Sequence, residues 1–275
     1  NSLEGILWLH EFGHNKGRSH RNGTSNVMHP SIASSRLGLN TDECNALSVP
    51  SPGVAGAELV LAAGGGSGTD ATETGVEPPA DVRDFVRQHF FHGVPYDVAR
   101  RYGPEAAGPL LEILADPAEQ EWWVNIVAVA GMIGAEDQVF EPLVGFLEDS
   151  GEVLSAEHYR AKATVPLALG YLANQSGSEA AVDYLVAAAD PAYWAGRNVG
   201  RAEFQASVFE RNADLATKAI LGLALSGSDR ALEALQQMQQ LEAPALPGAA
   251  AVIEEAIDAN RVIAAEGMSE YYDGQ

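Results

Sequence analysis

Residues 128–143 read Ala128-Val-Ala-Gly-Met-Ile-Gly-Ala-Glu-Asp-Gln-Val-Phe-Glu-Pro-Leu143, and their pattern recurs through most of the chain. An apolar segment that contains a glycine passes through a short polar turn into an amphipathic segment that ends on leucine. Similar phrases occupy 167–185 and 221–235. Apolar residues at steps of three and four are typical of helices that bury one face. The sequence therefore predicts a repeated pair of helices.

Helical patterns continue on both sides of these copies, and clusters of Asp, Gly, Pro and Ser separate them. The predicted helices are 80–91, 95–102, 104–115, 119–134, 137–148, 156–173, 178–189, 207–225, 228–241 and 248–265. No segment with the two-residue period of a strand is evident among them. We therefore expect an all-helical region.

Gly131, Gly170 and Gly222 hold equivalent places in the three copies, 39 and then 52 residues apart. The larger gap contains an apparent insertion at about 190–206. Small residues let paired helices approach closely. Helical pairs of this length resemble the HEAT-like family of repeats over about 104–265, which implies an α-solenoid. A plain helical bundle is the alternative.

Acidic residues outnumber basic residues 38 to 16, and the formal net charge is −22. Because a general nucleic-acid binder needs a basic surface, we expect no nucleic-acid partner. An anionic membrane surface is disfavoured for the same reason. No apolar run approaches the roughly 20 residues needed to span a bilayer. Cys44 is the single cysteine, which excludes an intramolecular disulfide.

The composition divides the chain into parts. Residues 1–48 hold four acidic and four basic side chains, together with four of the seven histidines. The segment 49–79 is rich in Gly, Pro and Ser, which is typical of a flexible linker. The predicted organisation is therefore a first module at 1–48, a linker at 49–79 and an all-α repeat domain at 80–270.

The sequence His10-Glu-Phe-Gly-His14-Asn-Lys-Gly17-Arg-Ser-His20 carries the clearest chemistry. On a helix, His10 and His14 lie one turn apart on the same face, where two imidazoles can share Zn²⁺. Gly17 lets the chain turn back, so that His20 can supply a third nitrogen. Three neutral ligands leave a fourth position open, which is typical of a catalytic site. Glu11 should face that position, where it can take a proton from an attacking water.

The stretch Asn26-Val-Met-His-Pro30 follows this motif. Together they resemble the metzincin zinc endopeptidases, and the short interval to Met28 is most like the matrixin branch. His29 stands where matrixins commonly have Tyr. The resemblance implies zinc ligation by His10, His14 and His20, general base and acid catalysis by Glu11, and a hydrophobic floor, the Met-turn, formed by Met28.

The resemblance implies a zinc-dependent endopeptidase that acts on a protein or peptide substrate in a secreted, extracellular or periplasmic location. It covers only 1–48. The family's upstream sheet, whose edge strand binds the substrate, would precede Asn1, so we expect the catalytic domain here to be truncated. The alternative is a protein-binding α-solenoid scaffold whose zinc site is vestigial or incomplete.

Two weaker signals have two interpretations each. His89 and His92 flank two phenylalanines, and a helix end with aromatic packing is favoured over a second metal site. The aromatic pairs 122–123 and 193–194 could bind a partner protein, but packing in the core of the repeats is favoured.

Overall fold

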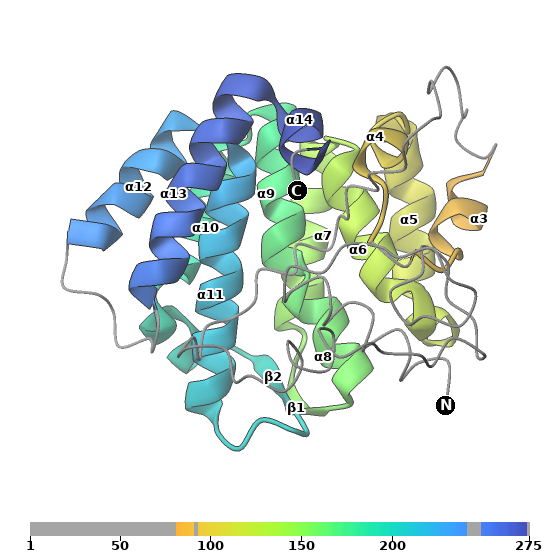
Figure 1. The fold of residues 1–275 in the computed structure, drawn as a ribbon. Helices are drawn as coiled ribbons and strands as arrows, with labels where there is room; N and C mark the ends of the chain where they lie inside the picture. The colour runs from red at the N-terminus through yellow and green to blue at the C-terminus, as the bar shows by residue number, and fades with distance from the viewer. Residues whose placement is uncertain (1–80, 91–92, 241–248, 274–275) are drawn as a thin grey trace, which may run out of the picture. The chain divides into compact units, whose positions relative to one another are not determined.

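The computed structural model describes residues 81–90, 93–240 and 249–273, and these residues form a mainly helical body (Figure 1). The mainly α fold is therefore confirmed for this part of the chain. The predicted catalytic module 1–48 and the predicted linker 49–79 lie outside the described residues.

The described elements are α-helices, short 3-10 helices (η) and two short strands. In chain order they are α3 (Val82–Val86), α4 (Tyr96–Ala99), η1 (Pro104–Ala106), α5 (Ala107–Leu114), η2 (Pro117–Trp122), α6 (Trp123–Met132), α7 (Glu136–Glu148), β1 (Ser150–Leu154), α8 (Ala156–Ala163), α9 (Val165–Ser176), α10 (Glu179–Ala188), η3 (Pro191–Gly196), β2 (Val199–Ala202), α11 (Val208–Ser226), α12 (Asp229–Gln240), α13 (Ala249–Glu266) and α14 (Met268–Asp273).

Each copy of the repeated phrase forms two consecutive helices: α6 and α7, α9 and α10, then α11 and α12. The first helices of the three copies pack in a row, with α9 between α6 and α11, and α11 packs in turn on α13 (Figure 1). α9 is buried from Val165 to Ala173, as expected for a helix with neighbours on several sides. α12 is more exposed and buries only Ala231 and Leu235.

Gly131, Gly170 and Gly222 lie where the backbones of α6, α9 and α11 come into close contact. A Cβ added at Gly131 of α6 would lie under 3.0 Å from the backbone of Ala168 in α9. A Cβ at Gly170 of α9 would come as close to Gly222 of α11, and one at Gly222 would meet the carbonyl of Pro166. The glycines therefore lie where the first helices of successive pairs meet. The expectation that they bring together the two helices of one pair was wrong.

The predicted helix 156–173 is two helices in the structure, α8 and α9, with Thr164 between them. Pro166 lies in the first turn of α9, where its missing N–H costs no helical hydrogen bond. Gly177 ends α9 in the left-handed conformation, with a φ of 71°. The side chain of Ser178 then caps the first turn of α10.

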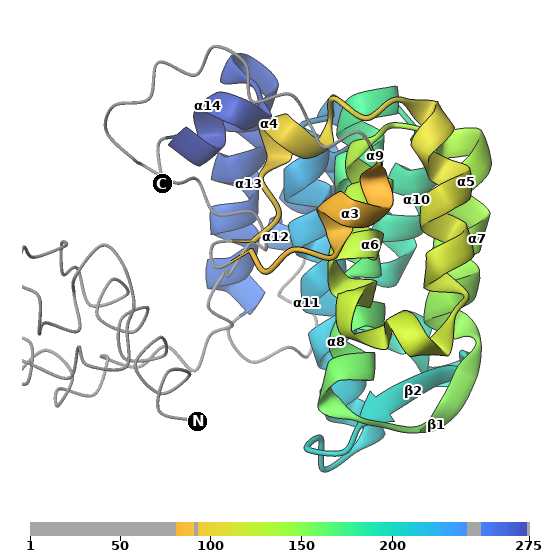
Figure 2. The ribbon, with the colours of Figure 1, turned by 90° about the vertical axis from the view of Figure 1, so that its right-hand side faces the viewer.

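The expectation that no strand interrupts the helices was wrong. β1 and β2 pair in parallel, with Val153 opposite Arg201 and Leu154 opposite Ala202. They lie together at the end of the body next to α8 (Figure 2). Neither strand shows a clean apolar alternation, and the pairing joins segments far apart in the chain. A local pattern therefore does not reveal them.

Arg211 of α11 holds the predicted insertion in place. Its side chain is 5% exposed. The guanidinium donates hydrogen bonds to the carbonyl of Trp194 at 2.9 Å, to the carbonyl of Val199, and to Oδ1 of Asn212 at 3.0 Å. Burial lowers the pKa of Arg211. Because these bonds satisfy a buried cation, η3 and β2 are fastened to the helical body.

The aromatic pairs 122–123 and 193–194 contribute to the core, as the favoured interpretation predicts. Trp123 and Trp194 are buried, and Trp122 and Tyr193 are half-buried against the same core. The indole N–H of Trp194 donates to a backbone carbonyl of α10 at 2.7 Å. Two aromatic residues of the insertion are therefore part of the packed body.

We predict that Gly170→Ala lowers the free energy of unfolding by about 1–3 kcal/mol, because the new methyl group would force α9 and α11 apart. Gly145 lies in α7 with nothing within 4 Å of an added Cβ, and Gly145→Ala is the matched control. It should stabilise the protein by about 0.5–1 kcal/mol through helix propensity. Urea unfolding measures both values. Equal effects of the two substitutions would contradict the close helix contact.

Candidate functional site

The predicted zinc site lies outside the described residues. Its members are His10, Glu11, His14, His20 and Met28, and their roles stay predictions. Within 81–90, 93–240 and 249–273, no group of three or more His, Cys, Asp or Glu side chains is placed to hold a metal ion.

The favoured interpretation of His89, packing at a helix end, is confirmed. The imidazole ring packs against Trp122, with 4.9 Å between the ring centroids. Phe90 packs against Phe85 of α3 at 5.1 Å. His92, the second histidine of that pattern, lies outside the described residues.

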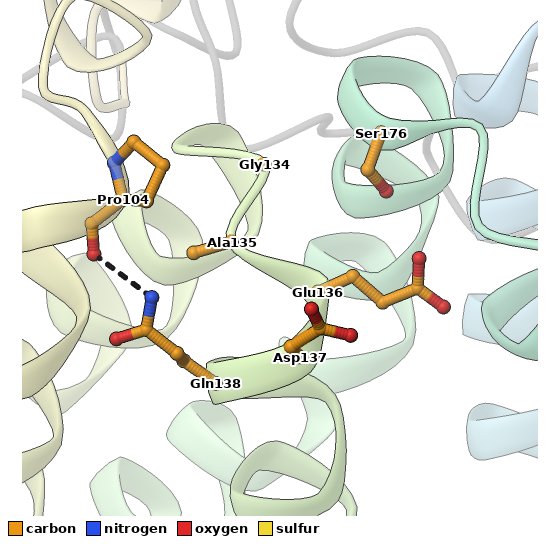
Figure 3. Close-up of a pocket in the computed structure, with 7 residues that line it drawn as sticks. All are labelled: Pro104, Gly134, Ala135, Glu136, Asp137, Gln138 and Ser176. Carbon is orange, nitrogen blue, oxygen red and sulfur yellow. Dashed lines mark hydrogen bonds between the residues drawn. The ribbon is translucent and has the colours of Figure 1, made fainter.

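A shallow hollow of about 300 Å³ lies at the start of α7. Figure 3 shows the residues that line it, which come from η1, from the turn before α7 and its first residues, and from the end of α9. They are Pro104, Gly134, Ala135, Glu136, Asp137, Gln138 and Ser176. No local sequence pattern marks this hollow, because its walls come from three separate segments.

Most polar side chains in the hollow already have partners within the protein. The amide of Gln138 donates to the carbonyl of Pro104 at 3.4 Å (Figure 3). The hydroxyl of Ser176 donates to a carbonyl of its own helix at 2.7 Å, and Glu136 accepts from Ser178 at 2.6 Å. The exposed carboxylate of Asp137 completes an acidic rim. The lining residues include no histidine, cysteine or lysine, so they do not resemble a nucleophilic or zinc site.

A buried lysine is the most unusual charged group of the body. Lys162 of α8 is 1% exposed, and its ammonium contacts the C-terminal end of α7. It donates to the carboxylate of Asp149 at 2.5 Å and to the carbonyl of Phe146. Burial lowers the pKa of Lys162, and the bond to Asp149 opposes that shift. The lysine acts as a cap that ties α8 to α7, because cations stabilise helix C-termini.

Aromatic rings surround this lysine. Its ammonium lies 4.5 Å from the centroid of Phe146, and His158 packs 4.9 Å from Trp123. Burial first, and then the charge of Lys162, lower the pKa of His158. None of these residues lines the hollow at the start of α7. Because Lys162 is bonded to the end of α7 and the rings pack on one another, we assign them a structural role.

A tyrosine cluster holds the C-terminal helix against the body. Tyr96 of α4, Tyr171 of α9 and Tyr272 of α14 lie together, and the hydroxyls of Tyr171 and Tyr272 are 2.5 Å apart. Ser269 adds a hydrogen bond to Asp97 at 2.7 Å. α14 was not among the predicted helices, and this cluster explains how so short a helix is stabilised.

Comparison with known proteins identifies no relative: no family model, no curated protein and no solved structure matches the chain. In the described ranges, none of the helices combines the length and apolar character needed to cross a membrane. Function must therefore be inferred from the chain's own residues.

Alkaline pH should unfold the protein. Burial raises the pKa of all eight tyrosines, to about 12 for Tyr102. In the unfolded chain a tyrosine has a pKa of about 10, and in the folded chain its pKa is higher. The free energy of unfolding is therefore unaffected below about pH 10 and falls as the pH rises further. Urea unfolding followed above about pH 10 should show this fall.

Tyr272→Phe should make that fall shallower than Tyr193→Phe does, because Tyr272 is buried and Tyr193 is half-buried. Tyrosinate absorbance measured alongside should rise together with the loss of helical circular dichroism. Ionisation of most tyrosines near pH 10 in a chain that stays folded would contradict the prediction.

Proposed function

We propose that residues 1–48 are the C-terminal part of a metzincin-like zinc-dependent endopeptidase, to which a helical repeat domain is attached. The observation that carries this proposal is the spacing of His10, Glu11, His14 and His20, followed by Met28. A bare pair of histidines around a glutamate is a weak signal. The added glycine, third histidine and methionine make the combination specific.

The donor set fits zinc. Three imidazole nitrogens with an open fourth position are the ligands of many catalytic zinc sites. Zn²⁺, when bound, would supply Lewis-acid polarisation of the scissile carbonyl. Glu11 then takes a proton from the attacking water and returns it to the leaving amine. Met28 supplies an apolar floor beneath the three histidines.

The described body supports a repeat architecture of the HEAT-like kind. Three successive helix pairs pack through their first helices, and glycines at equivalent positions form the contacts. In a solenoid, each repeat contacts mainly its neighbours and presents an extended surface to partners. We propose that this domain binds a protein.

The second candidate function is a protein-binding scaffold without hydrolysis. The size of the helical body relative to the motif segment favours it. The two functions differ in one property: only the endopeptidase needs the carboxylate of Glu11.

We predict that Glu11→Ala lowers peptide hydrolysis about 100-fold or more and leaves the zinc content unchanged. The reason is that the carboxylate transfers protons and is not a ligand. Hydrolysis of a fluorogenic peptide by the full-length protein and elemental analysis of the same purified protein give the two readouts. Glu4→Ala, a neighbouring glutamate outside the motif, is the control and should retain both.

Unchanged hydrolysis in Glu11→Ala would contradict the proposed role of this residue. A wild-type chain that binds zinc and a partner protein, but hydrolyses no peptide in any variant, would favour the scaffold.

A further inference from the structure

Exposed large apolar side chains gather at one end of the helical body. Among the described residues they are Val153 at 55%, Phe204 at 67%, Val208 at 50% and Phe209 at 55% exposure. We call these four residues the apolar patch. They come from β1, from the turn after β2 and from the start of α11, which lie at the same end in both views (Figures 1 and 2). Single exposed apolar residues are ordinary, but a group of four bulky ones marks an interaction surface.

The backbone beneath the apolar patch is held in place. Glu203 donates its N–H to the carbonyl of Leu154 at 2.9 Å, which ties the turn after β2 to β1. The ring of Phe204 packs edge-on against Tyr159 of α8, with centroids 6.2 Å apart. The side chain of Ser207 caps α11. The exposed side chains therefore stand on a preorganised frame, which lowers the entropy cost of binding.

Acidic residues flank the apolar patch. Glu203 and Glu210 are the chain neighbours of Phe204 and Phe209, and both are exposed. One carboxylate oxygen of Glu210 accepts from the N–H of Ala206 at 2.7 Å. Three cations lie in the neighbouring elements: exposed Arg160 in α8, half-buried Arg201 in β2 and buried Arg211 in α11.

Two of these cations are turned toward the protein backbone. Arg201 donates to the carbonyl of Gln205 at 2.6 Å, and Arg211 is bonded to carbonyls of η3 and β2. Arg160 is then the one exposed cation of the three, against the exposed carboxylates of Glu203 and Glu210, so the charge beside the patch is mainly negative.

We propose that the apolar patch binds a segment of a partner protein in which bulky apolar side chains alternate with lysine or arginine. Apolar burial supplies the affinity, and the glutamates select the basic residues. A second copy of this chain would bring the same acidic rim and be repelled, as would an anionic membrane. The apolar patch shares no residue with the proposed zinc site, and this proposal does not rest on that site.

The test uses the full 275-residue chain and a fluorescein-labelled peptide of alternating leucine and lysine, read by fluorescence anisotropy. The double substitution Phe204→Ser and Phe209→Ser should weaken binding about tenfold or more, and Phe209→Leu should retain it. Glu203→Lys should also weaken binding. Glu254→Lys, an exposed residue of α13 with the same change of net charge, should not. Circular dichroism verifies that each variant is folded.

Three results would overturn the proposal. Equal effects of Glu203→Lys and Glu254→Lys, with no effect of the phenylalanine substitutions, would show nonspecific attraction to an acidic protein. If a peptide of alternating leucine and glutamate bound as tightly as the leucine–lysine peptide, the proposed selection of basic residues would be contradicted. Dimers of the wild-type chain in sedimentation that Phe204→Ser abolishes would identify a second copy as the occupant.

Discussion

The contact of helix backbones at Gly131, Gly170 and Gly222 is the constraint on which the rest of the described structure depends. At these points α6, α9 and α11 approach so closely that no side chain fits between them. The small residues around the glycines, such as Ala168, extend the contact along the helices. The close approach leaves α9 surrounded by protein, and it sets the places where the second helices and the inserted strands can pack.

The long helices of the body could be predicted from the sequence, because each shows a helical period and ends at a glycine, a proline or a capping residue. The boundary at Thr164 was missed, since the apolar pattern runs through it and only Pro166 marks the break. β1 and β2 were missed for a different reason. Their pairing joins segments about fifty residues apart in the chain, and Arg211 of α11 holds β2 through a hydrogen bond to the carbonyl of Val199. No local pattern contains these contacts.

The candidate sites also differ in how far they could be predicted from the sequence. The proposed zinc ligands are close in sequence, so their spacing along the chain is enough to propose their chemistry. The hollow at the start of α7 and the apolar patch each combine segments that are distant in the chain. The burial of Lys162 could not be predicted either, because the sequence shows only a single lysine in an alanine-rich helix. Its burial follows from the packing of α8 against the end of α7.

The charge distribution relates the two proposals to each other. Residues 1–48 are balanced in charge, and the rest of the chain carries the whole excess of −22. An acidic helical domain with a fixed apolar patch would raise the local concentration of basic, partly apolar protein segments near any attached catalytic unit. Binding and hydrolysis would then be separable functions of one chain.

The most direct test of the proposed zinc enzyme is the zinc K-edge X-ray absorption spectrum of the purified chain. We predict one zinc per chain, with three imidazole nitrogens at about 2.0–2.1 Å, and loss of that metal in His14→Ala. A spectrum without imidazole ligands, or zinc that stays bound when His14 is replaced, would contradict the proposal.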